Sequence, residues 1–534
     1  MIKNLFLVYL ITIYFQCYGH KSPNCAIQFN KSFYCNGDTA WFKVWVPENL
    51  IAEKAIAKVR IKEIGEENIL DEFHLLVDSS GGSDGYILIP NTTPSGSYTF
   101  AVVLYDKDTY ELLLRLYHLI VIINDSTDEI PVLYSINGIW NDLRENNVIA
   151  IETKSVEYHP REEIQLNIQI KDGLGASIAS YLSISVVESE NFLNIPDMSF
   201  SHTEASGKGN NHILITENAW DNALKEEIIN SNLLLFVNET GNIIQGTTNE
   251  YGQFNVQMEA FTGMQTIQCW DYFGRDMQLS SMDFFMPDVY EKGNSICRSN
   301  ELKDYLERNV LRKKINYIFH VPGHTSVEDD KQDWQIEPDF VVESSNYEPF
   351  KDLKEFMETV ITPLKILKNK DGLIAKMVNP QSKPYFAKEP IFIIDHVLSS
   401  FKEVLDLDMY NIRSIEFYNR TETLKRFGLL GENGIVAFNT NKFQINRYEK
   451  KLKVVNGLQG PVMYPKSIHI NVNKRQPLLG TCIYWNPDLK VDAFGFLRIS
   501  FFHNDEPGIY KIRILGKLEN GEFIVGESSY RVIV

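Results

Sequence analysis

Apolar side chains recur at every second position in several short segments, and no other feature of the chain constrains its fold as strongly. Phe42, Val44 and Val46 alternate with larger or charged side chains, and residues 164–170 and 510–514 repeat the pattern. A period of two residues is typical of a strand whose two faces meet different surroundings. We therefore predict a mainly β protein built as a string of β-sandwiches.

Length and composition indicate several packed domains. The chain has 534 residues, of which 44% are hydrophobic and 12% aromatic, whereas a single domain usually has about 100 to 200 residues. Its net charge of −18 comes from 70 acidic and 52 basic side chains, without a long run of either sign. This balance argues against phosphate-driven binding of nucleic acid and favours a soluble protein.

The first residues have the pattern of a secretory signal. A charged start is followed by the apolar run 5–15, and cleavage after Gly19 would place Cys17 and Gly19 at the −3 and −1 positions. Lipidation of Cys17 is the weaker alternative, because bulky Tyr14 and Phe15 precede it. We expect residues 1–19 to be a signal peptide and the mature chain to be exported, without a transmembrane segment or a C-terminal anchor signal.

Strand patterns define two sandwiches near the N-terminus, at residues 22–124 and 128–231. The second contains Tyr158-x-Pro160-x-Glu162 ahead of its alternating strand, then an Asp-Gly-Leu-Gly turn that ends at Gly175. Both units resemble macroglobulin-type (MG2) domains, which implies immunoglobulin-like sandwiches. Residues 232–290, with turns around 238–242 and 249–254, are similar to the carboxypeptidase regulatory-like module, a structural appendage without peptidase activity.

Helical patterns interrupt the strands in residues 291–348, which we interpret as a helix followed by an acidic linker. An apolar stripe at helical spacing begins at Leu302, and Asp304 lies four residues before Arg308, where the two could form an ion pair. A second helix is predicted at about residues 350–360, stopping near Pro363.

Residues 390–440 carry the most specific pattern in the chain. A buried strand ends at Asp395, a second strand follows at 412–416, and Phe427-Gly428 precedes a third strand at 434–440. In this order the segment resembles the plug domain of TonB-dependent outer-membrane receptors, with His396 in place of the usual glycine. The resemblance covers residues 349–450 and implies a small α+β domain.

The plug-like domain is expected to have no barrel of its own. Receptors of that family continue into about 22 strands of about 10 residues each, whereas only 94 residues follow Thr440. Residues 451–534 instead alternate as strands and are interpreted as a C-terminal sandwich. As a whole the chain resembles exported multidomain proteins of the Bacteroidetes type that combine macroglobulin-like domains with a barrel-less plug-like domain.

The residues that formally match catalytic or metal-binding motifs mostly have a simpler structural interpretation. Gly81-Gly82-Ser83-Asp84-Gly85 formally matches a nucleophile elbow, but a strand follows it where the elbow requires a helix, so we interpret it as a hairpin loop. His320 and His324 are separated by Pro-Gly and have no third ligand nearby, which disfavours a metal site. Asp395-His396 is more typical of a turn than of an acid-base pair.

Cysteine patterns indicate neither zinc binding nor a thioester. Five cysteines remain after cleavage, so at least one is unpaired within the chain, and Cys25 and Cys35 could form a disulfide or stay free. The macroglobulin resemblance would imply protease trapping through a Cys-Gly-Glu-Gln thioester, but Cys25-Ala26-Ile27-Gln28 lacks the Gly-Glu pair. We predict no catalytic residue, no cofactor and no metal.

The remaining interpretation is a non-enzymatic envelope protein, periplasmic or associated with the outer membrane, that binds a protein partner. The plug-like resemblance implies contact with an outer-membrane barrel or an envelope complex, and no nucleic acid is expected. The alternative is a macroglobulin-like protease inhibitor without a thioester, or an enzyme with an unrecognised site. The candidate partner-binding residues all lie in the plug-like segment: Asp395, His396, Arg413, Tyr418, Arg420 and Arg426.

Overall fold

The computed structural model describes residues 23–534 with gaps. The gaps are residues 52–53, 67, 107, 110, 128–130, 137–147, 172–174, 179, 190–194, 202–206, 209–211, 222–225, 272–275, 282–289, 296–298, 320–335, 349, 371, 383, 442–451, 461–463 and 465–475. The predicted signal peptide and the His320 and His324 pair lie outside the described residues. Two compact units are formed: residues 1–211, 284–327 and 459–534 in unit 1, and residues 212–283 and 328–458 in unit 2.

The first sandwich of unit 1 is formed by the strands predicted between residues 22 and 124, together with one strand from further along the chain. One sheet has the order β14-β1-β3-β6 and the other β2-β8-β7-β4-β5. The strands are β1 (Cys25–Phe29), β2 (Tyr34–Cys35), β3 (Thr39–Trp45), β4 (Ala55–Glu63), β5 (Ile69–Val77), β6 (Gly82–Leu88), β7 (Gly96–Tyr105), β8 (Leu112–Ile123) and β14 (Met198–Ser201). The short strands β9 (Val132–Ile136) and β22 (Tyr290–Ser295) pair beside it.

Strand β3 carries large apolar side chains on both of its faces. Phe42 and Val44 lie in the core between the two sheets, while Trp45 points to the opposite face and packs with Met198 and Leu515. Both faces of the strand are therefore buried. One contributes to the first sandwich, and the other joins it to the second.

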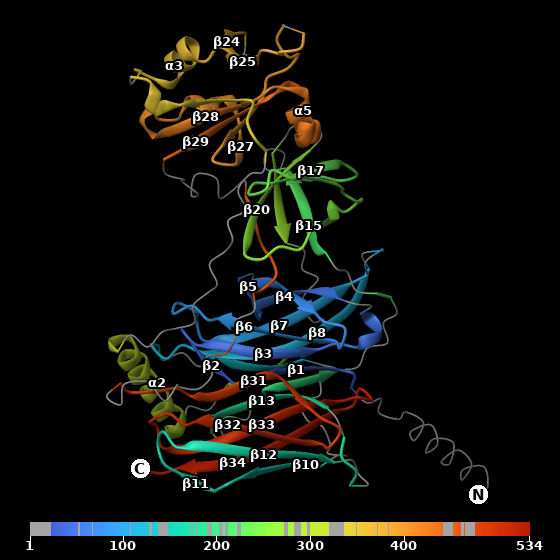
Figure 1. The fold of residues 1–534 in the computed structure, drawn as a ribbon, viewed down its shortest axis with the longest axis vertical. Coiled ribbons are helices and arrows are strands. Elements are labelled where there is room, and N and C mark those ends of the chain that lie inside the picture. The colour runs from blue at the N-terminus through green and yellow to red at the C-terminus, as the bar shows by residue number, and fades with distance from the viewer. Residues whose placement is uncertain are drawn as a thin grey trace, which may run out of the picture. The chain divides into compact units, whose positions relative to one another are not determined.

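The second sandwich combines two segments that are distant in the sequence. One sheet has the order β10-β12-β32 and the other β11-β34-β33-β13-β31, and Figure 1 shows the teal strands β12 and β13 lying among the red strands β31 to β34. The strands are β10 (Val148–Thr153), β11 (Glu157–Tyr158), β12 (Glu163–Lys171), β13 (Ser180–Glu188), β31 (Cys482–Val491), β32 (Phe496–Phe502), β33 (Gly508–Leu518) and β34 (Phe523–Val532).

This arrangement corrects the prediction of separate sandwiches at 128–231 and 451–534. The alternating residues of β12 pair with those of β32, for example Ile164 with Phe501 and Leu166 with Ile499. All four side chains belong to one hydrophobic core. Each segment supplies only part of both sheets, so neither contains a complete sandwich.

Helix α2 (Asn300–Ile318) confirms the first predicted helix and is capped by Ser299, whose side chain accepts a hydrogen bond from Leu302 N. Its buried face becomes polar toward the C-terminal end, where Arg312 is 4% exposed. Arg312 forms ion pairs with Glu188 at 2.7 Å and with Glu506 at 2.5 Å. The predicted Asp304–Arg308 ion pair is wrong, since Arg308 pairs with Glu188 instead, at 2.8 Å.

Unit 2 begins with a β module that extends beyond the predicted limits of 232–290. Strand β15 had been assigned to the preceding sandwich but pairs with β19 and β21, and β30, assigned to the last sandwich, pairs with β20. The strands are β15 (Ile213–Asp221), β16 (Glu226–Glu227), β17 (Asn232–Val237), β18 (Ile243–Thr247), β19 (Gln253–Met258), β20 (Met264–Asp271), β21 (Asp276–Ser281) and β30 (Lys453–Asn456).

The rest of unit 2 is an α+β domain with a five-stranded sheet in the order β23-β28-β29-β26-β27. The three strands predicted within residues 390–440 are present as β26, β28 and β29, and α3 confirms the second predicted helix. The elements are β23 (Phe340–Glu343), α3 (Leu353–Val360), β24 (Leu364–Lys368), β25 (Leu373–Met377), β26 (Ile391–Ile394), β27 (Val397–Ser399), α4 (Phe401–Leu405), β28 (Ile412–Tyr418), α5 (Thr421–Leu424), the 3-10 segment η4 (Lys425–Asn433) and β29 (Ile435–Thr440). Shorter 3-10 turns are η1 (Glu48–Leu50), η2 (Ser344–Asn346) and η3 (Met409–Asn411).

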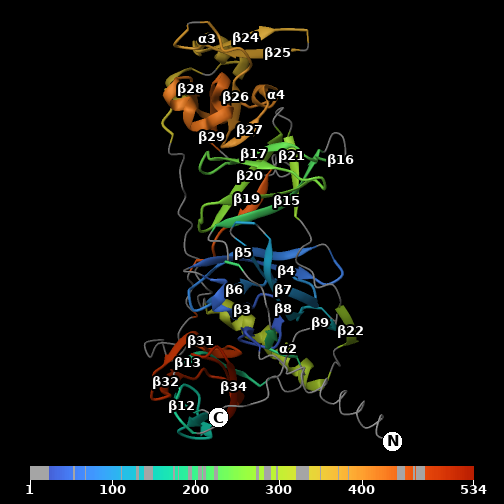
Figure 2. The same cartoon turned by 90° about the vertical axis from the view of Figure 1, so that its right-hand side faces the viewer.

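Both faces of this sheet are covered. Phe392 and Phe438 face a core shared with α3 and with the β24–β25 hairpin. Ile393 and Ala437 face the opposite side and pack with Phe427 of η4. Figure 2 shows α3, β24 and β25 on one side of the sheet and the module strands β17 and β20 on the other. Among the described helices, none is both long and apolar enough to cross a membrane.

Candidate functional site

The six predicted partner-binding residues do not form one surface. Asp395 contacts Thr440 at the end of β29, and Thr440 pairs with Ile412, the neighbour of Arg413. Arg420 and Arg426 follow the other end of β28. Five residues separate Arg413 from the end of that strand, a distance of about 17 Å at the usual rise per residue.

Asp395 and His396 form the two-residue turn between β26 and β27. Their φ angles are 47° and 68°, the left-handed values that a type I′ hairpin turn requires at both central positions. The Asp395 carboxylate accepts hydrogen bonds from Thr440 N at 2.6 Å and from Thr440 Oγ1 at 2.5 Å. Asp395 therefore has a structural role, and exposed His396 adopts a conformation that favours glycine.

Tyr418 is a correction to the predicted surface. Its side chain is only 1% exposed because the ring packs edge-on against Phe427, with centroids 5.1 Å apart. Its hydroxyl donates to Glu416 Oε2 at 2.7 Å. Burial, followed by the Glu416 carboxylate, raises the pKa of Tyr418 well above its ordinary value. Tyr418 thus anchors the domain and offers no surface to a partner.

Asp339 fixes the segment that carries the other basic residues. Its carboxylate accepts hydrogen bonds from Asn419 N at 2.7 Å, Arg420 N at 2.8 Å and Thr423 Oγ1 at 2.7 Å. These bonds satisfy donors at the start of α5, where a helix has no internal acceptors. The chain therefore enters η4 in a fixed direction.

Phe427 then sets the orientation of its neighbours. Its ring is buried between the sheet and the module, while Lys425 and Arg426 are exposed. At Gly428 the φ angle is 52°, which breaks the helical path. One buried aromatic ring and one left-handed glycine thus place two cations together on the surface of the domain.

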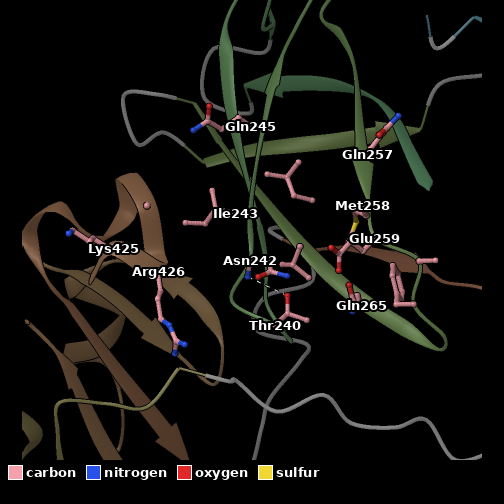
Figure 3. A pocket seen from close by; sticks show the side chains of 15 residues that line it. Thr240, Asn242, Ile243, Gln245, Gln257, Met258, Glu259, Gln265, Lys425 and Arg426 are labelled. Atoms are coloured by element: carbon pink, nitrogen blue, oxygen red, sulfur yellow. Dashed lines mark hydrogen bonds between the residues drawn. The ribbon is translucent and has the colours of Figure 1, made fainter. Parts of the chain in front are cut away.

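These two cations line a cleft that encloses about 480 Å³ within unit 2. Figure 3 shows Lys425 and Arg426 on the ribbon of the α+β domain and Gln245 and Gln257 on strands of the module. The remaining lining residues, all from the module except Gly428, are Val237, Thr240, Asn242, Ile243, Ile244, Met258, Glu259, Ala260, Phe261, Gln265 and Gly428.

The module side of the cleft is held by hydrogen bonds in two loops. Glu239 accepts from Thr266 N at 2.8 Å and from Thr266 Oγ1 at 2.7 Å, which fixes the turn before β18. Leu458 N donates to Phe261 O at 2.7 Å, which fixes the loop after β19. A cleft whose walls are ordered before binding loses less entropy when a ligand enters.

The lining residues suit recognition more than chemistry. Gln245, Gln257 and Asn242 each supply an amide that can both donate and accept hydrogen bonds, as a peptide backbone requires. Lys425 and Arg426 supply positive charge on the opposite wall. The cleft can therefore bind an extended polypeptide that carries a carboxylate near the two cations.

Sequence reasoning identified Arg426 and missed the rest of the cleft. Lys425 adjoins Arg426, and two consecutive cations before the buried Phe427 were a signal that could have included it. The module residues carried no such signal, because their contact with η4 depends on tertiary packing. Among the described residues, no group of three His, Cys, Asp or Glu side chains is arranged to hold a metal ion.

The described cysteines and the glycine-rich motif have structural roles. Cys25 and Cys35 are both buried and free, so of the two alternatives, a disulfide or free thiols, the structure has free thiols. Burial raises the pKa of Cys25 to about 12. The predicted hairpin loop at 81–85 is mostly strand, because β6 begins at Gly82. A serine within a strand, not followed by a helix, lacks the geometry of a nucleophile elbow.

Comparisons with known proteins give little beyond general similarity. No protein-family profile matches the chain, and no curated protein matches it. Solved structures that overlap with it include trypsin-activated alpha-2-macroglobulin from Escherichia coli, at 8% identity over 96% of this chain and 41% of that chain with a TM-score of 0.24. Salmonella alpha-2-macroglobulin reacted with methylamine overlaps at 8% identity over 96% of this chain and 40% of that chain, with a TM-score of 0.25.

An adhesin also overlaps in part. InvE of Yersinia pseudotuberculosis matches at 12% identity over 49% of this chain and 60% of that chain, with a TM-score of 0.13. This chain spans about two fifths of the length of the macroglobulins it overlaps. The strands of the structure itself show that the chain is a mainly β protein. TM-scores this low assign neither a function nor a role to any residue.

Proposed function

We propose that this protein is an exported, non-enzymatic binding protein that holds a segment of a polypeptide partner in the cleft of unit 2. The observation that carries the proposal is the position of Lys425 and Arg426 opposite the amide-bearing strands of the module. The charged start and apolar run of residues 1–15 support export, to the periplasm or the periplasmic face of the outer membrane.

The chemistry of the cleft favours a peptide over a small apolar ligand. Small-molecule sites are usually enclosed and mostly apolar, whereas this cleft combines six apolar side chains with amides, two cations and Glu259. An extended peptide can exchange hydrogen bonds with Gln245 and Gln257 while an acidic side chain or a carboxyl terminus meets Lys425 and Arg426. The plug-like resemblance of the α+β domain adds an envelope complex as the kind of assembly from which the partner would come.

The test compares two variants that remove the same kind of charge, one from residues that line the cleft and one from residues that do not. Full-length Lys425→Gln/Arg426→Gln and a control, Arg413→Gln/Lys402→Gln, are each expressed with an affinity tag and purified from cross-linked envelopes. The proposal predicts that a partner recovered with the wild-type chain and with the control is lost with the cleft variant.

Equal recovery by the two variants would contradict the assignment of the cleft. Turnover of protease or glycosidase substrates by the purified wild-type protein would contradict the non-enzymatic assignment. Both variants are checked by circular dichroism, since all four side chains are exposed and their replacement is expected to leave folding unchanged.

A further inference from the structure

The β24–β25 hairpin of unit 2 has an exposed basic face. The hairpin is a separate two-stranded sheet, and its inward side chains Leu364, Ala375 and Met377 pack into the core of the α+β domain. Lys365 and Lys376 are direct cross-strand partners on the opposite face. Side chains at such positions are about 5 Å apart at Cβ, and like charges placed there repel each other.

Further lysines lie near this pair in the sequence. Residues 364–388 contain six lysines and a single acidic residue, Asp371, in a chain where acidic side chains outnumber basic ones. Lys368 and Lys370 are exposed at the end of the hairpin. Among the described residues no carboxylate forms a salt bridge with Lys365, Lys368, Lys370 or Lys376.

The two lysines of the central pair contact neutral groups, although the Glu389 carboxylate lies at the edge of the hairpin, where Oε1 accepts a hydrogen bond from Ala375 N at 2.8 Å. Lys365 Nζ lies 6.0 Å from the centroid of the Tyr385 ring, and Lys376 Nζ donates to the neutral carbonyl oxygen of Ala387. Neither contact brings a negative charge. Leu367, 37% exposed, and Tyr385, 42% exposed, add apolar area beside the two ammonium groups.

We infer that this basic face, formed by Lys365, Leu367 and Lys376, is a docking surface for an acidic polypeptide segment with apolar side chains between its carboxylates. Carboxylates would neutralise the repelling lysines, and an intervening apolar side chain would cover Leu367. Electrostatic complementarity of this kind selects the partner and accelerates encounter. Among the described residues of the hairpin, none lines the cleft, so this second surface does not depend on the proposed function.

The charge of the whole chain favours a short acidic segment over a larger polyanion. DNA carries one negative charge per about 1.7 Å of its axis, and an extended anionic surface would repel a protein of net charge −18. A segment with three or four carboxylates meets only the local positive field of the hairpin. Vesicles and oligonucleotides therefore serve as contrasting probes.

The experiment measures fluorescence anisotropy of a labelled heptapeptide of alternating glutamate and leucine, titrated with the full chain. The variant Lys365→Gln/Lys376→Gln is compared with Lys351→Gln/Lys402→Gln, which removes the same charge from exposed lysines elsewhere in unit 2. We expect the Kd to rise about ten-fold in the hairpin variant, to stay unchanged in the control and in Lys365→Arg/Lys376→Arg, and to rise with added salt.

Several results would overturn the inference. They are no binding by the wild-type chain, equal Kd values for the hairpin variant and the control, or equal binding of a lysine-leucine heptapeptide. Tighter lysine-dependent binding to vesicles with 30% phosphatidylglycerol or to a single-stranded oligonucleotide would also overturn the assignment to a polypeptide. Lys425→Gln/Arg426→Gln tests whether the heptapeptide occupies the cleft instead: a Kd that rises in this variant and stays unchanged in the hairpin variant would overturn the inference, and the reverse result would support it.

Discussion

Gln268 and Leu398 exchange two hydrogen bonds that close the edge of the five-stranded sheet. Gln268 Nε2 donates to Leu398 O at 3.2 Å, and Leu398 N donates to Gln268 Oε1 at 2.6 Å. Leu398 lies in β27, the last strand of the sheet. The side-chain amide of Gln268 thus makes the two hydrogen bonds that a residue of a neighbouring strand would otherwise make with the backbone of Leu398.

The same device occurs in unit 1. Gln459 Nε2 donates to Tyr86 O at 2.6 Å, and Tyr86 N donates to Gln459 Oε1 at 2.9 Å. Tyr86 belongs to β6, the edge strand of the sheet β14-β1-β3-β6. Exposed strand edges pair readily with other chains, so covering these two edges disfavours association there.

Gln268→Ala is expected to lower the free energy of unfolding of unit 2 by about 2 kcal/mol, because it leaves a buried N–H and C=O of Leu398 without partners. The measurement is urea unfolding followed through the fluorescence of Trp270 in the module. Gln245→Ala, at an exposed position on β18, is the matched control and should change the same quantity by less than about 0.5 kcal/mol. Equal effects of the two substitutions would show that the edge contact contributes nothing.

His396→Gly is expected to raise the free energy of unfolding by about 1 kcal/mol, since the left-handed conformation strains every residue except glycine. The φ angle of 68° at His396 is the observation behind this sign. His396→Ala retains the strain and serves as the control, so a gain from both substitutions would contradict the explanation. Thermal unfolding of the full chain measures both.

Arg312→Ala is expected to cost about 3 to 5 kcal/mol, because it leaves the buried Glu188 and the partly buried Glu506 without their shared partner. Arg308 pairs with the same Glu188 but is half exposed. Arg308→Ala should therefore cost less than about 1 kcal/mol. Unfolding of unit 1 by urea distinguishes the two, and similar losses would contradict the role assigned to the buried pair.

His118 is expected to make unit 1 less stable in acid. Its ring stacks on Phe29 with centroids 4.7 Å apart, Nδ1 lies 2.8 Å from Ser199 Oγ, and burial lowers its pKa to about 3. In the unfolded chain the pKa is about 6.5, so between these values only the unfolded state binds the proton. The stability is therefore complete above pH 6.5 and is lost as the pH falls toward 3.

The test compares the free energy of unfolding at pH 7.5 and pH 5.0, followed by the tryptophan fluorescence of the first sandwich. His118→Gln should reduce the difference between the two pH values by about 2 kcal/mol, the amount that one proton contributes over 1.5 pH units. His159→Gln, at an exposed position, is the control. An unchanged difference in His118→Gln would contradict the burial argument.

The sequence predicts strand positions better than strand partners. The alternation at Ile164, Leu166 and Ile168 correctly indicates a strand with one buried face, because burial follows from a period of two. The alternation carries no information on which strand pairs with β12, and its partner strand β32 lies more than 300 residues away in the sequence. The predicted domain borders therefore divide a sandwich that the fold keeps whole.

The sequence predicts less of the candidate site than of the strands. Of the six predicted partner-binding residues, Arg426 is the one that lines the cleft. Tyr418 is predicted to belong to the partner-binding surface, but η4 folds back and covers it with Phe427. The meeting of Gln245 with Lys425 depends on packing between the module and the α+β domain, which no local pattern encodes.

Site-specific photo-crosslinking tests the proposed binding role most directly. A photoreactive benzoylphenylalanine is placed at position 260, an exposed position that lines the cleft, or at position 413, which does not line it, and cells expressing the full chain are irradiated. We predict a discrete crosslinked partner at position 260 that disappears when Lys425→Gln/Arg426→Gln is added, and no such product at position 413. The same crosslinked product from both positions, or a product at 260 that Lys425→Gln/Arg426→Gln leaves unchanged, would contradict the proposal that the cleft binds the partner.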